Sequence, residues 1–175
     1  MVEIHKRAAA IKLVIFDVDG VLTDGRLFFD EQGREYKSFH ARDGLGIKLL
    51  QQTGVKVAII SGRKAPSVSV RMQGLGIAPE LVFLGEDKKL EAFEKLMAAL
   101  KLTDMQIAHV GDDLPDLPLL RRVGLAIAVA DAHRSVLPHA HWQTRNPGGC
   151  GAAREVCDLL MDAQGTLDQM INRHL

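Results

Sequence analysis

Short apolar runs alternate along this chain with longer stretches in which apolar and polar residues are mixed. The runs have the length and β-branched content of buried strands, and they lie at residues 13–16, 55–60, 81–83, 107–110 and 125–129. The mixed stretches carry cap residues and glycine stops that predict helices, at about residues 43–52, 66–74, 87–100 and 154–163. Because crossovers between parallel strands place helices on both faces of a sheet, the pattern predicts an α/β fold with a doubly wound parallel sheet.

Two segments fall outside this alternation. Residues 27–30 and 34–39 flank a turn that contains Gly33, a pattern that predicts a β-hairpin. We expect it to form a flap over about residues 26–40 that overhangs the end of the first strand. A polar tail follows the last helix over about residues 165–175, and we expect it either to be disordered or to reach a neighbouring active site.

The composition indicates a globular protein and argues against several classes of partner. The 22 basic and 22 acidic residues balance, so no overall field attracts nucleic acid or an anionic membrane. No apolar run is long enough for a transmembrane helix. Cys150 and Cys157 are seven residues apart, which on a helix points them the same way, so no disulfide is expected. We expect a cytoplasmic protein with one domain over residues 1–175.

Acidic residues follow two of the predicted strands. Asp17 and Asp19 follow the first strand, and Asp112, Asp113 and Asp116 follow the fourth. The carboxyl ends of parallel strands meet at one edge of a sheet, so the two groups are expected to lie together. A turn or a helix N-cap would also use such residues, but capping accounts less well for Asp112, directly at a strand end. Oxygen ligands from Asp17 and Asp112 suit Mg²⁺. An ionised Asp17 suits a nucleophile and Asp19 an acid/base in phosphate-ester cleavage.

Groups able to hold a phosphate follow the second strand and precede a later helix. The Ser61 hydroxyl and the backbone N–H groups near Gly62 can donate hydrogen bonds, although an ordinary strand-to-helix turn explains Ser61 alone. Lys88 and Lys89 lie at a predicted helix start, where a cation opposes the helix dipole. This mild conflict indicates that one of them points into a site, and Lys88 is our candidate, with a solvated lysine pair as the alternative.

Two further segments carry weaker signals. Arg63 and Lys64 are candidates to bind a substrate carboxylate, since arginine grips such groups with two parallel hydrogen bonds; a solvated pair is the alternative. The glycines of residues 148–151 precede a helix and can cradle a phosphate through backbone amides. A flexible loop that positions the tail is the interpretation we prefer.

In chain order these motifs resemble the four motifs of the haloacid dehalogenase superfamily, most of whose members are phosphatases. The resemblance is closest to the small-cap phosphatases that act on eight- and nine-carbon sugar acids, and it runs from about residue 11 to the tail. It is carried by residues 17–25, 42–44, 61–64, 111–113, 129–133 and 148–157. One departure is Cys150 within the glycine-rich segment, to which we assign no role.

The resemblance implies a Rossmann-like, Mg²⁺-dependent phosphatase for a phosphorylated sugar acid of bacterial lipopolysaccharide synthesis. It implies metal binding by the carboxylates of Asp17 and Asp112 and by the backbone carbonyl of Asp19, with Asp113 and Asp116 around them. It also implies phosphate binding by Ser61, Gly62 and Lys88. Members of the family form homotetramers in which a neighbour completes the site, because a hairpin flap is too small to close it.

The sequence leaves alternatives open. A related nine-carbon sugar-acid phosphate is a second candidate substrate. A receiver-type signalling domain also combines a five-stranded α/β sheet, Mg²⁺ and a phospho-aspartate without being an enzyme, although its acceptor Asp ends a middle strand. A phosphomutase needs a larger cap to exclude water from its intermediate, and the chain lacks the length for one.

Overall fold

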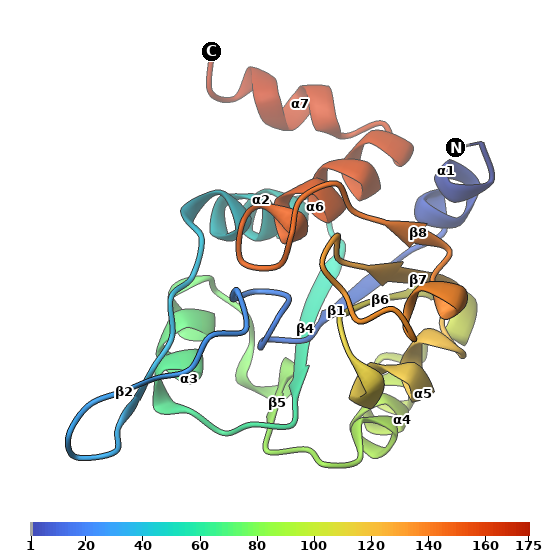
Figure 1. Cartoon of the computed structure of the whole chain (residues 1–175). Coiled ribbons are helices and arrows are strands. Elements are labelled where there is room, and N and C mark those ends of the chain that lie inside the picture. Colours follow the sequence, from blue (N-terminus) through green and yellow to red (C-terminus); the bar gives the residue numbers. More distant parts are fainter. Residues whose placement is uncertain (1) are drawn as a thin grey trace.

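The centre of the protein is a parallel sheet, seen in a computed structural model that describes residues 2–175 (Figure 1). Six strands form it within those residues, in the order β5-β4-β1-β6-β7-β8, and every neighbouring pair is parallel. The strands are β1 (Leu13–Phe16), β4 (Lys56–Ser61), β5 (Val82–Leu84), β6 (Ile107–Gly111), β7 (Leu125–Ala128) and β8 (Trp142–Gln143). The predicted α/β fold is confirmed.

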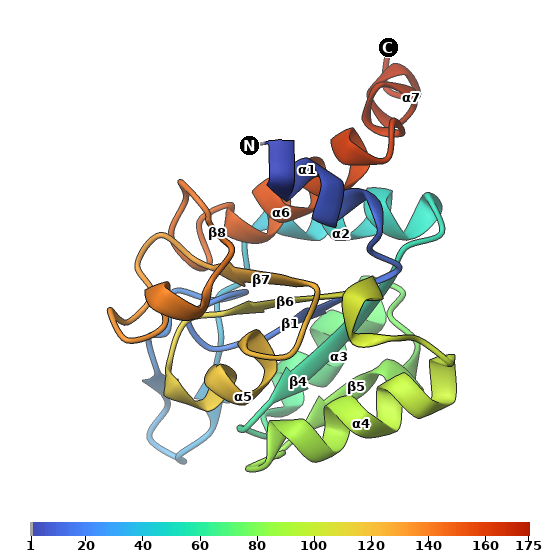
Figure 2. The same cartoon turned by 90° about the vertical axis from the view of Figure 1, so that its right-hand side faces the viewer.

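Helices cover both faces of the sheet, as Figure 2 shows for α2 and α6 on one side and α4 and α5 on the other. The α-helices are α1 (Val2–Ala9), α2 (Ala41–Gln52), α3 (Pro66–Gly74), α4 (Lys89–Leu100), α5 (Leu117–Leu120), α6 (Ala152–Ala163) and α7 (Leu167–Asn172). Short 3₁₀ turns occur at η1 (Pro79–Leu81), η2 (Asp104–Gln106), η3 (Leu114–Asp116) and η4 (Leu137–His139).

Alternation along the central strand divides the core into two layers. Val14 and Phe16 pack in the layer formed with α2, α3 and α6. Leu13 and Ile15 pack in the layer formed with α4 and α5. All four side chains of β1 are fully buried, because a strand with helices on both faces has no solvent side. For this reason the sequence of β1 is a continuous apolar run.

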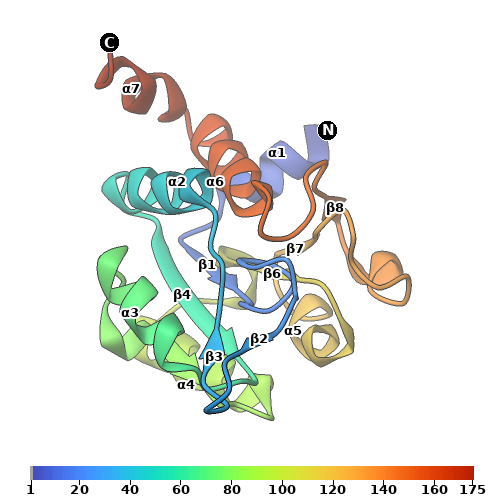
Figure 3. The same cartoon turned by 60° about the vertical axis from the view of Figure 1, so that its left-hand side comes forward.

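The predicted hairpin is present, and it projects from the body of the protein in Figure 1, while Figure 3 brings it to the front. Its strands are β2 (Phe28–Phe29) and β3 (Glu35–Tyr36), which pair antiparallel. Several elements were not predicted, among them helices α1, α5 and α7 and the edge strand β8. Disorder of the tail is therefore wrong for Leu167–Asn172, where Met170 buries its side chain.

Asp43 has a different role from the predicted one. We expected it to cap the helix that follows the hairpin, but α2 begins two residues earlier and is preceded by His40. The Asp43 carboxylate instead accepts hydrogen bonds from the backbone N–H groups of Gly151 (3.3 Å) and Arg154 (2.8 Å). These groups lie at the start of α6, where N–H groups lack partners within the helix. Asp43 thus fastens the glycine-rich segment to α2.

Among the residues described, no helix is at once long enough and apolar enough to cross a membrane. The cysteines Cys150 and Cys157 are free, as predicted.

Candidate active site

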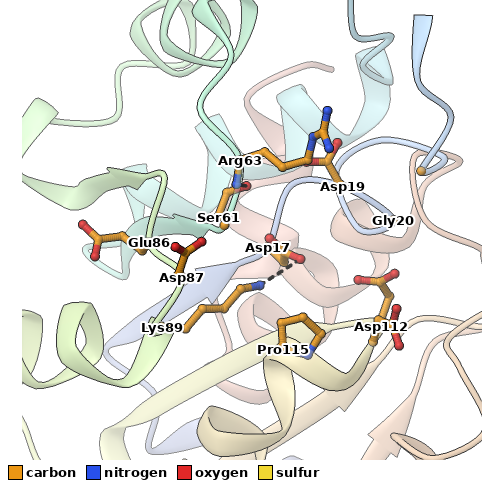
Figure 4. A pocket seen from close by; sticks show the side chains of 13 residues that line it. Asp17, Asp19, Gly20, Ser61, Arg63, Glu86, Asp87, Lys89, Asp112 and Pro115 are labelled. Atoms are coloured by element: carbon orange, nitrogen blue, oxygen red, sulfur yellow. Dashed lines mark hydrogen bonds and ion pairs between the residues drawn. The ribbon is translucent and has the colours of Figure 1, made fainter.

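The register of the sheet gathers the predicted site residues at one edge. Phe16 of β1 pairs with Ile59 of β4 on one side and with Val110 of β6 on the other. The chain therefore leaves all three strands at the same level, which places Asp17, Ser61 and Asp112 around one cavity of about 340 Å³ (Figure 4). Other predicted residues that line it are Asp19, Gly62, Arg63 and Asp113.

Asp17 lies at the bottom of this cavity with an unusual environment for a carboxylate. Its side chain is 11% exposed, and Oδ2 is 2.9 Å from Nζ of Lys89. Burial and the charge of Asp116 raise the pKa of Asp17 and Lys89 lowers it, and together these effects bring the pKa to about 6. A carboxylate in this setting is held in place by one ammonium and is short of positive charge.

Asp112 is partly buried beside Asp17, and its charge is less well compensated. Burial, together with the nearby carboxylates of Asp116 and Asp17, raises the pKa of Asp112 to about 8. Crowded carboxylates repel one another unless a cation or a proton intervenes. The site therefore has a deficit of positive charge between Asp17 and Asp112.

Asp116 is buried, and its ionised form is stabilised by hydrogen-bond donors and a positive charge around it. Burial opposes its ionisation, but the hydrogen bond and charge of His109 and the charge of Lys89 hold the pKa of Asp116 well below its usual range. Its Oδ2 accepts hydrogen bonds from the backbone N–H groups of Asp112 (3.0 Å) and Asp113 (3.4 Å). Asp116 thus fixes the backbone that carries Asp112.

Lys89, rather than Lys88, lies in the site. The Nζ atom of Lys89 is 2.9 Å from Asp17 Oδ2 and 2.7 Å from Asp116 Oδ1, and its side chain is 3% exposed. Burial opposes its charge, but Asp17 and Asp116 raise the pKa of Lys89 above its ordinary value. The side chain of Lys88 is 79% exposed and lies 3.5 Å from Glu91. Our choice of Lys88 was therefore wrong.

The periodicity of α4 contains the signal that separates the two lysines. Lys89 is the first member of a buried stripe that continues at Ala92, Phe93 and Leu96, the spacing of one helix face. Lys88 precedes the helix as its N-cap, with a backbone that is not helical. A lysine on the buried face of a helix must either extend its ammonium group to solvent or pair it with carboxylates in the interior of the protein.

Ser61 and Arg63 stand at the rim formed by β4. Ser61 is buried, and its Oγ atom accepts a hydrogen bond from the backbone N–H of Arg63 (3.3 Å). The guanidinium of Arg63 donates to Glu35 of the hairpin (2.8 Å). That hydrogen bond lowers the pKa of Glu35 and raises that of Arg63. Lys64 lines a separate hollow between α3 and β5, so it does not share the cavity with Arg63.

The hairpin contributes a residue that the sequence did not suggest. Lys37 forms ion pairs with Asp19 and with Glu35 (2.6 Å), and its side chain is 1% exposed. Glu35 links it further to Arg63 at the mouth of the cavity. The predicted flap is thus attached to the site by ion pairs.

Glycines allow two loops to approach closely beside Asp112. Gly20 has φ of +85°, and a Cβ atom there would lie 2.1 Å from Oδ2 of Asp112. A Cβ atom on Gly148 would lie 1.8 Å from the carbonyl oxygen of Gly20. Gly149 also donates its N–H to the carbonyl of Val21 (2.9 Å). The glycine-rich segment therefore supports the loop after β1, and it does not line the cavity as a phosphate cradle would.

The donor set is suitable for a hard divalent cation. Within the described residues, carboxylate oxygens of Asp17, Asp112 and Asp116 lie within 4.8 Å of one another. Asp116 already interacts with Lys89, His109 and two backbone N–H groups, which leaves Asp17 and Asp112 as ligands. Two carboxylates completed by water are a usual environment for Mg²⁺, and a dication would relieve the repulsion between them.

We predict a pH-dependent stabilisation by Mg²⁺. The pKa values of Asp17 and Asp112 are raised to about 6 and about 8, so the folded state binds more protons than the unfolded state above about pH 4. The stability they contribute is therefore present at low pH and lost as the pH rises through these values. Mg²⁺ offsets this loss and meets less competition from protons at high pH. Calorimetry should thus give a larger rise in Tm with Mg²⁺ at pH 8 than at pH 6.

The Asp112→Asn variant is the control for this measurement, because it removes one ligand and one of the two raised carboxyl groups. Its Tm should respond little to Mg²⁺ at either pH. An equal rise in Tm at pH 6 and pH 8 for the unmodified protein would contradict the assignment of these carboxylates.

Known proteins resemble this chain in sequence along most of its length. The family model of the haloacid dehalogenase-like hydrolases matches residues 82–154. The 3-deoxy-D-manno-octulosonate 8-phosphate phosphatase of Yersinia pestis is 47% identical over 166 residues, which are 95% of this chain and 88% of the relative. A match to a named enzyme over this length contradicts the alternative of a non-enzymatic receiver domain.

Solved structures agree with this. A probable phosphatase from Pseudomonas syringae pv. phaseolica 1448a is 52% identical, with a TM-score of 0.97 over 99% of this chain and 98% of the other. The 3-deoxy-D-manno-octulosonate 8-phosphate phosphatase of Moraxella catarrhalis is 39% identical, with a TM-score of 0.97 over 100% and 99%. That crystal contains magnesium, phosphate and the sugar acid. The chain therefore belongs to the haloacid dehalogenase-like hydrolases, in the family of the 3-deoxy-D-manno-octulosonate 8-phosphate phosphatases.

Proposed function

We propose that this protein hydrolyses 3-deoxy-D-manno-octulosonate 8-phosphate to the free sugar acid and inorganic phosphate. The observation that carries the proposal is the buried group formed by Asp17, Lys89 and Asp112 at the end of the central strands, in a chain 47% identical to enzymes of that name. A magnesium-dependent reaction follows from the same donor set, and the Moraxella catarrhalis structure contains this ion.

Asp17 is the proposed nucleophile. A carboxylate oxygen attacks phosphorus, a phospho-Asp17 forms, and the bond from phosphorus to the sugar oxygen breaks. Asp19 donates a proton to that departing oxygen. Asp19 then takes a proton from the water that attacks the phospho-enzyme, which releases phosphate and restores Asp17. Bound Mg²⁺ supplies positive charge to the phosphate oxygens during both displacements.

The phosphate is proposed to bind among Ser61, Gly62 and Lys89. The Ser61 hydroxyl and the backbone N–H of Gly62 are the hydrogen-bond donors on the β4 side of the cavity. The ammonium of Lys89 lies on the opposite side, where it contacts Asp17 and has one donor free from its two carboxylate contacts. Arg63 is the proposed partner of the sugar-acid carboxylate, for which it would exchange Glu35.

We further propose that a homotetramer is the active form and that the protein acts in the cytoplasm, in the synthesis of lipopolysaccharide precursors. The hairpin exposes four large apolar or aromatic side chains to between 47% and 57%, namely those of Leu27, Phe28, Phe29 and Tyr36. A two-stranded hairpin is marginally stable alone, and such a patch is typical of an interface. Neighbouring copies around the hairpin would cover the mouth of the cavity.

The test of the function is phosphate release from a panel of sugar phosphates, with and without Mg²⁺. The eight-carbon acid phosphate should have the highest kcat/KM, and the nine-carbon analogue should be a poorer substrate. Removal of Mg²⁺ should abolish release. The Asp17→Asn variant should be inactive with an unchanged circular dichroism spectrum, because an amide is not a nucleophile. Near-normal turnover by this variant would disprove the proposed intermediate.

Lys88 and Lys89 form a matched pair for a second prediction. Lys89→Met should lower kcat/KM by about 10²- to 10³-fold, the range for loss of one preorganised donor to a transition state. Lys88→Met removes the same charge from the neighbouring residue and should change kcat/KM by less than about 2-fold, as expected for an exposed ion pair. Equal losses of kcat/KM in the two variants would contradict the specific role of Lys89, because they would show that only the total positive charge near the site matters.

The oligomer has its own test, by sedimentation velocity and by activity. The unmodified protein should sediment as four copies, and Phe28→Glu should dissociate it with a loss of activity, because a charge would be buried in the interface. Met105→Glu is the control: Met105 is 60% exposed and lies in the η2 turn, away from the hairpin. A fully active monomer would contradict the proposed completion of the site by neighbours.

A further inference from the structure

One buried titratable side chain has no part in the reaction described above. His109 lies in the middle of β6 and is fully buried. The other residues of this strand are apolar or glycine: Ile107, Ala108, Val110 and Gly111. Along β6 the side chain of His109 faces the layer that contains α4 and α5, since Ala108 and Val110 face the opposite layer. An aliphatic residue would be the expected choice at this position.

The surroundings of His109 make its presence costly. Its Nδ1 atom is buried and has no hydrogen-bond partner among the described residues, and an unpaired buried polar atom destabilises a fold. The opposite ring nitrogen has a specific partner, because Nε2 is 2.9 Å from Oδ1 of Asp116. Since Asp116 is ionised, Nε2 carries the proton and donates. The His109 ring therefore has one hydrogen bond, from Nε2 to Asp116, and one nitrogen, Nδ1, without a partner among the described residues.

Asp116 stands between His109 and the nucleophile. Its Oδ1 atom accepts from both His109 Nε2 and Lys89 Nζ, at 2.9 and 2.7 Å. Lys89 Nζ is in turn 2.9 Å from Asp17 Oδ2. A continuous chain of polar contacts thus runs from His109 through Asp116 and Lys89 to Asp17. Every member is buried, so each contact acts in a medium of low polarity where its strength is large.

We infer that His109 is a positioning residue for Lys89 in the phosphate-transfer reaction. His109 donates a hydrogen bond to Oδ1 of Asp116, which stabilises part of the negative charge on that carboxylate. The ammonium of Lys89 can therefore contact both Asp116 and Asp17. Without this donor, Lys89 is the nearest remaining side-chain cation and moves toward Asp116. The contact between Lys89 and Asp17 then lengthens, and the nucleophile is less well oriented. His109 itself does not line the cavity.

Two amide variants separate this role from a structural one. The Nε2 atom of a glutamine reaches the place of the histidine Nε2, whereas the Nδ2 atom of an asparagine reaches only the place of Nδ1. His109→Gln therefore keeps a donor to Asp116, and His109→Asn lacks it while placing a similar polar group in the core. A merely structural role would be affected alike by both substitutions.

The measurement is kcat and KM with p-nitrophenyl phosphate at saturating Mg²⁺. His109→Asn should lower kcat about 10-fold, the equivalent of one charge-assisted hydrogen bond, with KM changed by less than about 3-fold because ground-state phosphate contacts remain. His109→Gln should keep kcat within about 3-fold of the unmodified enzyme. Equal values of kcat in the two variants, each normalised to folded protein, would overturn the inference.

A double-mutant cycle tests the route through Lys89. In the Lys89→Met background, the difference in kcat between the Gln and Asn variants at position 109 should disappear, because residues that act as a unit are not additive. A difference that persists at its full size would overturn the inference as well.

The inference rests on the proposed phosphatase chemistry at Asp17, and p-nitrophenyl phosphate makes the two failures distinguishable. Hydrolysis of this ester without hydrolysis of the sugar-acid phosphate would reject the proposed substrate alone, while the comparison of the position-109 variants still decides the role of His109. Should the Asn variant not fold, His109→Leu takes its place, since it also lacks the donor and suits the apolar layer.

Discussion

The central constraint in this protein is the crowding of three carboxylates around one ammonium. Asp17, Asp112 and Asp116 have oxygens within 4.8 Å of one another, and Lys89 is the buried cation that contacts two of them. Burial and mutual repulsion raise the pKa of Asp17 and of Asp112, whereas contacts with donors lower that of Asp116. The uncompensated charge is thus concentrated on the two carboxylates nearest the cavity, which is where a dication and a phosphate can both be held.

The fold supports this crowding by placing rigid backbone behind every charged group. Asp17 follows a strand that is buried on both faces, and Asp116 holds the turn after β6 by hydrogen bonds to two backbone N–H groups. The loop after β1 packs against Asp112 and against Gly148, at distances that only glycine permits. Because repulsion would otherwise separate the carboxylates, the close approach of these loops is part of the electrostatic arrangement as well as of the packing.

The hairpin connects this interior to the exposed surface of the protein. Lys37 pairs with Asp19 and Glu35, and Glu35 pairs with Arg63, so one chain of charges runs from the proposed acid/base to the residue proposed to bind the substrate carboxylate. Binding of an anionic sugar would change the partners along this chain. The exposed aromatic side chains of the same hairpin offer a surface for neighbouring copies, which would bring assembly and closure of the cavity into the same element.

Local patterns in the chain were enough to predict the parallel sheet and the acidic groups at Asp17 and Asp112, because buried strands and the residues at their ends have recognisable sequences. They missed α1, and they missed β8, which has two residues and no periodicity to detect. The choice of Lys88 over Lys89 was an error that the apolar stripe of α4 could have prevented, since Lys89 is in register with Ala92 and Phe93. Tertiary contacts, in contrast, were needed to place Asp43 at the start of α6 and to bring Lys37 and His109 into contact with carboxylates of the site. Asp43, Lys37 and His109 are each held by a partner that does not adjoin them in sequence, so the residues next to them along the chain carry no signal of these contacts.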